Sequence, residues 1–172
     1  MPPDDAENTQ LREQISGLRR FALWLIRDIH EADDLVQTTL ERALDKWTTR
    51  RPEASLKSWL FTILYREFLL EKRRTKRYWE LLSRMKNDDN PVWPSAEQEI
   101  ATQSMLEAFG RLMPEQRSLL ILITLEGLSY QEVAHVMDIP IGTVMSRLSR
   151  ARQALHRLGE GETPQPILRL MK

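Results

Sequence analysis

The sequence predicts an all-α protein of two small helical domains joined by a flexible linker. Apolar residues recur at three- and four-residue spacing, and β-type alternation is scarce in this chain of 172 residues with 6 Gly. Two prolines and four Asn/Asp residues interrupt that spacing within residues 86–95. We therefore expect domains over residues 1–85 and 96–160, a linker over 86–95 and a loose tail over 161–172.

The N-terminal half is predicted to contain three helices. Apolar spacing indicates a first helix over about residues 8–27 and a second over residues 31–46, which ends near Trp47. Ser55 is a suitable N-cap for a third helix, which we expect to continue through Arg77 towards Leu82.

The C-terminal half is predicted to contain four further helices. The helical pattern resumes over residues 96–112, and Pro114 then begins a helix that runs to about Leu125, because proline is tolerated in a first turn. Ser129 and Glu132 have the spacing of a capping box and open a short helix that ends near Met137. A final helix is expected over residues 141–158.

Charge is strongly segregated along the chain, although 25 basic and 25 acidic residues cancel. The net charge is −5 over residues 1–41, +8 over 42–86, −7 over 87–141 and +4 over 142–172. Two basic segments separated by acidic ones favour two contacts with a polyanion. The alternative is that these segments are solvated basic helix faces.

Several classes of chemistry find no support in the sequence. Cysteine is absent, which excludes disulfides, Cys-ligated zinc and iron–sulfur clusters. The 3 histidines lie far apart, and no glycine-rich phosphate loop is present, so we expect no metal, no cofactor and no enzymatic activity. The acidic N-terminal segment is unlike a secretory signal, and no apolar run could span a bilayer, so we expect a cytoplasmic protein without membrane insertion.

The sharpest motif lies within residues 126–152. Two short helical patterns, over residues 128–137 and 142–155, flank a tight turn with the spacing of a helix-turn-helix. The second helix enters the major groove of DNA in that geometry, and arginine and serine side chains contact both bases and phosphates. We therefore expect duplex-DNA binding rather than a plain helical hairpin with a basic outer face.

The same residues carry a family resemblance. Glu126 to Arg152, which reads EGLSYQEVAHVMDIPIGTVMSRLSRAR, closely resembles the −35-binding domain of extracytoplasmic-function (ECF, group IV) RNA polymerase sigma factors. The upstream LMPEQR at residues 112–117 is similar to the segment that precedes this motif in the same family. In the N-terminal half, ADDLVQ at 32–37 and SLKSWLFTI at 55–63 are similar to the sigma region that binds polymerase and melts the −10 element.

The resemblance covers about residues 10–158 and implies a specificity subunit. Such a protein binds core RNA polymerase through the β′ clamp and β subunits, directs it to promoter DNA and leaves the chemistry to the polymerase. The family also implies an anti-sigma protein that holds the sigma factor inactive. Polymerase contacts are expected on an acidic-polar helix stripe, which alone would be read as a solvated face; its residues are Asp33, Asp34, Gln37, Leu40 and Glu41.

Two DNA-binding residue sets follow from the same resemblance. Aromatic rings stack on unpaired bases and cations hold phosphates, so the −10 set combines both kinds of side chain: Lys57, Trp59, Tyr65, Arg66, Phe68, Lys72, Arg73 and Arg74. For Trp59 the helical periodicity favours a core position. The −35 set comprises Arg117, Thr143, Met145, Ser146, Arg147, Arg150 and Arg152.

The sequence departs from the family pattern at two places. Residues 65–70 read YREFLL where many members carry Arg-Asn and a following Asp, and Met145 stands where a basic residue is usual. Both departures bear on promoter preference. Two alternatives stay open: a dimeric helix-turn-helix regulator that acts without polymerase, and a sigma-like decoy that binds only a regulatory protein.

Overall fold

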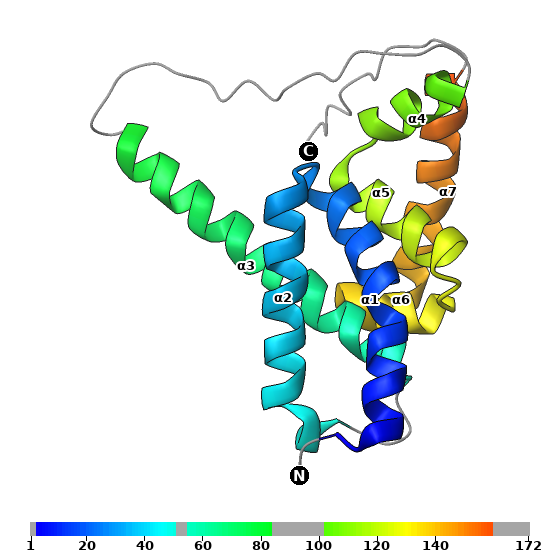
Figure 1. Cartoon of the computed structure of the whole chain (residues 1–172). Coiled ribbons are helices and arrows are strands. Elements are labelled where there is room, and N and C mark those ends of the chain that lie inside the picture. Colours follow the sequence, from blue (N-terminus) through cyan, green and yellow to red (C-terminus); the bar gives the residue numbers. More distant parts are fainter. Residues whose placement is uncertain (1–2, 51–54, 84–101, 160–172) are drawn as a thin grey trace.

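The computed structural model describes residues 3–50, 55–83 and 102–159, and within these ranges every regular element is helical (Figure 1). The N-terminal half contributes three α-helices and a short 3₁₀ turn, and the C-terminal half contributes α4 to α7. The all-α prediction is confirmed. The predicted linker at 86–95 and tail at 161–172 lie outside the described residues.

The first two helices form an antiparallel pair, and each has an aspartate as its N-cap. Helix α1 (Asp5–Ile26) starts earlier than predicted, because Asp4 accepts a hydrogen bond from the Glu7 backbone N–H and the Glu7 carboxylate reciprocates. Helix α2 (Ile29–Asp45) follows after Asp28, whose Oδ1 accepts two backbone N–H groups of the first turn. The turn η1 (Trp47–Thr49) then leads towards α3.

Helix α3 (Leu56–Ser83) is divided between a buried half and an exposed half. Leu60, Phe61 and Leu64 are fully buried against α1 and α2, and the apolar spacing predicted this for Leu60 and Leu64. Every residue from 70 to 77 is exposed, and in Figure 1 this end of α3 projects beyond the other helices. The helix therefore anchors in the core and presents a solvated arm.

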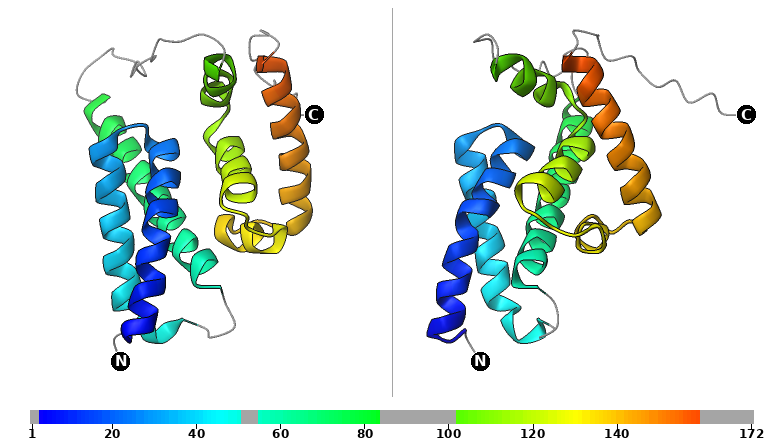
Figure 2. Two further views of the ribbon diagram at one scale, coloured as in Figure 1. Left: turned by 45° about the vertical axis from the view of Figure 1, so that its right-hand side comes forward. Right: turned by 90° about the vertical axis from the view of Figure 1, so that its right-hand side faces the viewer.

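Helices α4 (Thr102–Arg111), α5 (Pro114–Leu120), α6 (Tyr130–Met137) and α7 (Ile141–Gly159) form a second group beside the first (Figure 2). Helix α5 was predicted to run regularly to Leu125, but it changes into a π-helical turn, η2 (Ile121–Leu125). The Glu126 N–H bonds the Ile121 carbonyl five residues back, at 3.0 Å, which widens this turn.

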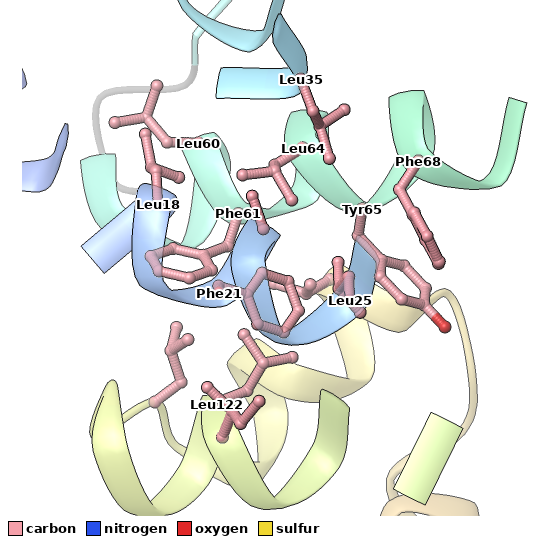
Figure 3. Packing of buried hydrophobic residues seen from close by; sticks show 14 of the residues in the cluster. Leu18, Phe21, Leu25, Leu35, Leu60, Phe61, Leu64, Tyr65, Phe68 and Leu122 are labelled. Carbon is pink, nitrogen blue, oxygen red and sulfur yellow. The ribbon is translucent and has the colours of Figure 1, made fainter. Parts of the chain in front are cut away.

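One apolar core runs through both groups of helices (Figure 3). Helix α1 packs on α5, and α3 packs on α6. Phe21 and Phe61 from the N-terminal half share this core with Leu122 from the C-terminal half, and all three are fully buried. The C-terminal half has a smaller core of its own, made by Ala108, Leu112, Leu120, Leu148, Ala151 and Leu158.

Phe61→Ala tests the importance of this shared core. The Phe61 ring lies 5.4 Å from the Phe21 ring, centroid to centroid, and is fully buried. We expect the substitution to lower the free energy of unfolding by about 3–5 kcal/mol in urea denaturation followed by circular dichroism. Leu70→Ala, on the exposed part of the same helix, is the control and should change it by less than about 0.5 kcal/mol. Equal effects of the two substitutions would contradict the core assignment.

Candidate nucleic-acid interface

The helix-turn-helix is held by the predicted capping box and by a backbone hydrogen bond in its turn. The Ser129 backbone N–H donates to Glu132 Oε2 at 2.8 Å, and the Glu132 backbone N–H donates to Ser129 Oγ at 3.3 Å, which completes the capping box of α6. Asp138 ends α6 with a left-handed φ of 54°. The Ile139 N–H then bonds the Ala134 carbonyl at 3.0 Å, so the turn into α7 is fixed by the backbone.

Helix α7 has one buried face and one largely exposed face. Val144, Leu148 and Ala151 anchor it in the core. The predicted recognition residues on α7 lie away from that anchor. Thr143 and Arg147 are half-buried. The other four are exposed: Met145, Ser146, Arg150 and Arg152. Met145 is an exposed apolar side chain, which suits contact with a thymine methyl group.

Arg117 occupies a different position from the rest of the predicted −35 set. It is only 7% exposed, and its guanidinium donates to the Gly110 carbonyl at 2.8 Å. Burial lowers its pKa to about 10, and the neighbouring Arg27 cation acts in the same direction. Arg117 therefore joins α5 to the end of α4 and does not reach the surface that α7 presents.

The exposed arm of α3 gathers most of the cations predicted for the −10 strand. Arg66, Lys72, Arg73 and Arg74 are all exposed, and Lys72 Nζ lies 5.6 Å from the centroid of the Phe68 ring. A polyanion could approach this arm without displacing any described helix. Lys57 differs, because it lies at the buried end of α3 and is half-buried.

The aromatic residues predicted to stack on bases lie inside the protein. Trp59 packs edge-on against Trp47 with ring centroids 5.9 Å apart, which agrees with the core position that periodicity favoured. Tyr65 is 5% exposed and Phe68 is 8% exposed. In this conformation neither ring is available to an unpaired base, because both are buried in the shared core.

The acidic-polar stripe on α2, predicted to contact polymerase, is largely exposed. Asp33, Asp34, Gln37 and Glu41 are exposed, and Leu40 is half-buried beside them. Asp33 accepts two hydrogen bonds from the Arg19 guanidinium, at 2.6 and 2.9 Å. The structure therefore leaves this stripe accessible to a protein partner.

In the described part of the chain, no three His, Asp or Glu side chains gather in a way that could hold a metal ion. No helix within the same ranges is long and apolar enough to cross a membrane.

Sequence reasoning missed one charged cluster altogether. Glu126 in the turn before α6 accepts hydrogen bonds from Arg20 of α1, and Lys57 of α3 lies 3.3 Å from the same carboxylate. Gly17 lies directly against it. The partners are separated by 106 and 69 residues in sequence, so no local pattern reports the cluster. The one available signal was Gly17, since glycine inside a helix often marks a close approach.

The fold and its surfaces define an all-helical protein with a helix-turn-helix in one half and a cationic arm in the other. Two family models match these halves separately. Residues 102–155 match sigma-70 region 4, and residues 11–65 match the sigma2 domain of PhyR.

Similar curated proteins cover most of the chain. The ECF RNA polymerase sigma factor EcfG of Rhodopseudomonas palustris is 33% identical over 158 residues, which is 92% of this chain and 87% of that protein. The ECF RNA polymerase sigma factor SigL of Mycobacterium tuberculosis is 31% identical, over 83% of this chain and 82% of its own length. The chain therefore belongs to the ECF RNA polymerase sigma factor family.

A solved structure agrees with this assignment. The sigma factor RpoE of Bartonella quintana, in complex with the anti-sigma factor NepR, has a TM-score of 0.74 and 33% identity, covering 91% of this chain and 98% of that one. CnrH in complex with the cytosolic domain of CnrY, with a TM-score of 0.64 and 22% identity, shares the fold.

Tyr65 provides a spectroscopic test of how the two halves pack. Burial raises its pKa from 10.0 to about 12, and Glu115 also raises it, whereas Arg147 opposes them. The folded state therefore favours the neutral phenol, so this contribution to stability is full below pH 10 and is lost as the pH rises through about 12. In an ultraviolet titration of tyrosinate we expect Tyr65→Phe to remove a late phase near pH 12. A titration curve that keeps this phase after the substitution would contradict the burial of Tyr65.

Proposed function

We propose that this protein is a group IV sigma factor that binds core RNA polymerase in the cytoplasm and directs it to specific promoters. The observation that carries the proposal is the presence of two separate cationic surfaces, one in each half, each half matching a sigma-type family model. The protein supplies recognition, and the polymerase supplies the chemistry. No catalytic residue, metal or cofactor is assigned to it.

The −35 element is proposed to bind α7. Arg150 and Arg152 are exposed there, together with Met145 and Ser146, and Thr143 and Arg147 border them. A helix in this position of a helix-turn-helix lies in the major groove. Arg117 is left out of the proposed surface, because it is buried and bonded to the Gly110 carbonyl.

The −10 strand is proposed to follow the exposed arm of α3. Its cations can hold backbone phosphates, while stacking by Tyr65 or Phe68 requires these rings to leave the shared core in which they are buried. Lys57, another cation of this set, contacts Glu126 of the other half. We accordingly expect strand capture to accompany a rearrangement of the two halves.

The polymerase clamp is proposed to bind the stripe on α2, from Asp33 to Glu41. Its exposed carboxylates favour a basic partner surface and fast association, and half-buried Leu40 adds an apolar contact. We also propose regulation by an anti-sigma protein, since the related RpoE was solved with the anti-sigma factor NepR.

The minimal, group IV organisation is supported by the interval between the two matched regions. Helix α3 continues to Ser83, which leaves residues 84–101 before α4. That length is too short for an independent domain.

One observation favours a second candidate function. The family model over residues 11–65 is the sigma2 domain of PhyR, and a solved complex describes PhyR as an anti-anti-sigma factor. A sigma-like decoy of that kind would bind an anti-sigma protein without supporting transcription. The exposed Arg150 and Arg152 favour the sigma factor, because a decoy has no need of cations on the recognition helix.

Run-off transcription decides between these functions. Core polymerase without its own sigma factor is combined with this protein and a promoter library. Promoter-dependent transcripts that require the added protein are the expected result. Silence on every template, with no co-migration of the protein and the polymerase, would overturn the proposal. Silence combined with binding to an anti-sigma protein would favour the decoy.

Arg150→Ala tests the proposed −35 surface. We expect it to weaken −35-dependent promoter binding by about 1–3 kcal/mol if the guanidinium contacts a base, or to lower the salt dependence by about one counterion if it contacts a phosphate. Polymerase binding in a pull-down should stay intact. Arg157→Ala, on the same helix but beyond the motif, is the matched control. Loss of polymerase binding in Arg150→Ala would contradict the assignment of α7.

A further inference from the structure

The carboxylate of Glu126 is the most deeply buried charged group in the described ion pairs. Its side chain is 1% exposed and lies where the two halves meet. Arg20 of α1 donates from Nε and Nη2 to Glu126 Oε1, at 2.8 and 2.6 Å. Lys57 of α3 donates to the Glu126 carbonyl at 2.6 Å and lies 3.3 Å from Oε2. A single acidic residue of the C-terminal half is thus held by two cations of the N-terminal half.

The carboxylate of Glu126 fits into a small socket that is formed where α1 and α3 meet the turn before α6. A Cβ placed on Gly17 would lie 2.7 Å from Glu126 Oε2, so the carboxylate approaches α1 where that helix has no side chain. The residue after Glu126 is Gly127, which has a φ of 68° and thus turns the chain towards α6. Phe61 lies under Lys57, with Nζ 5.9 Å from the ring centroid. The fit therefore depends on residues of three different elements.

Two further contacts join α1 to the C-terminal half. Together with the Glu126 contacts they form the seam, which is the line along which the two halves meet. The Arg27 guanidinium donates to the Gly110 carbonyl, and the Trp24 ring meets Phe109 edge-on with centroids 4.9 Å apart. In each pair one residue belongs to α1 or its C-cap and the other to α4. The seam thus extends from Glu126 along α1 to the end of that helix.

The seam occupies residues that DNA would need. Lys57 is engaged by Glu126, Tyr65 is covered, and Arg147 is half-buried within electrostatic reach of Tyr65. A buried ion pair of this kind fixes one arrangement, and separating it intact costs little, because hydration compensates both charges; removing one partner alone leaves the other charge buried without compensation and strongly disfavours that arrangement. Such a contact can specify a closed state that a binding partner is still able to open.

We propose that Glu126 is an autoinhibitory latch, which closes the C-terminal half onto the N-terminal half in the free protein and withholds Lys57 and Arg147 from promoter DNA. The role of those two cations rests on the proposed function. Closure itself does not, since it depends only on contacts within the chain. Engagement of polymerase or promoter then requires Arg20 and Lys57 to release the carboxylate.

Fluorescence energy transfer tests the closure directly. The chain contains no cysteine, so Gln10→Cys and Gln153→Cys, both at exposed positions in different halves, provide the only labelling sites. We expect efficient transfer in the otherwise unchanged free protein. Three variants should each lower the energy transfer. Glu126→Gln removes the negative charge, Arg20→Ala removes a partner of the carboxylate, and Gly17→Ala fills the space beside it. Arg19→Ala is the matched control, because Arg19 pairs with Asp33 within the N-terminal half.

The helical circular dichroism of each variant establishes that it is folded. Unchanged transfer in folded Glu126→Gln and Arg20→Ala, or low transfer in the unchanged protein, would overturn the latch. Glu126→Gln should also bind a promoter duplex about tenfold more tightly, if about a tenth of the wild-type protein is open. If Glu126→Gln shows lower energy transfer but binds the promoter duplex no more tightly, the proposal that closure withholds Lys57 and Arg147 from DNA is wrong. Failure of the proposed function is seen separately, as silence of the wild-type protein in run-off transcription.

Discussion

The structure depends on the burial of apolar helix faces that neither half can cover alone. Helix α5, the turn η2 and helix α6 are short, and much of their apolar surface, including Leu119, Leu122 and Val133, is buried in the core shared with α1 and α3. The smaller core of the C-terminal half covers only the other side. Because apolar burial is the main favourable contribution to folding, the shared core determines how the two halves sit.

The charged seam gives that apolar contact a single register. Apolar packing tolerates small shifts, whereas a carboxylate held by Arg20 and Lys57 beside Gly17 fits in one position. The cost of burying Glu126 is offset by its hydrogen bonds, so the pair acts chiefly on specificity. Packing and electrostatics therefore have distinct roles: one makes closure favourable, and the other makes it specific and reversible.

This arrangement connects the two proposed DNA surfaces with each other. The arm of α3 and the exposed face of α7 are accessible in the closed protein, while Lys57, Tyr65 and Phe68 lie at the seam or under it. A DNA-binding subunit with part of its surface covered is less prone to engage the excess of non-specific DNA around it. Polymerase, which would bind the opposite, acidic face on α2, could then couple its own binding to exposure of the covered residues.

The sequence by itself determined the helices, the helix-turn-helix and the family, because these depend on local patterns: apolar spacing, the Ser129–Glu132 capping box and a long contiguous motif. It also placed Trp59 in the core by periodicity. Only the tertiary structure decided that Arg117 is buried, that α5 ends in a π-helical turn and that Glu126 is held by Arg20. Those outcomes depend on contacts between residues far apart in the chain, about which spacing and composition carry no information.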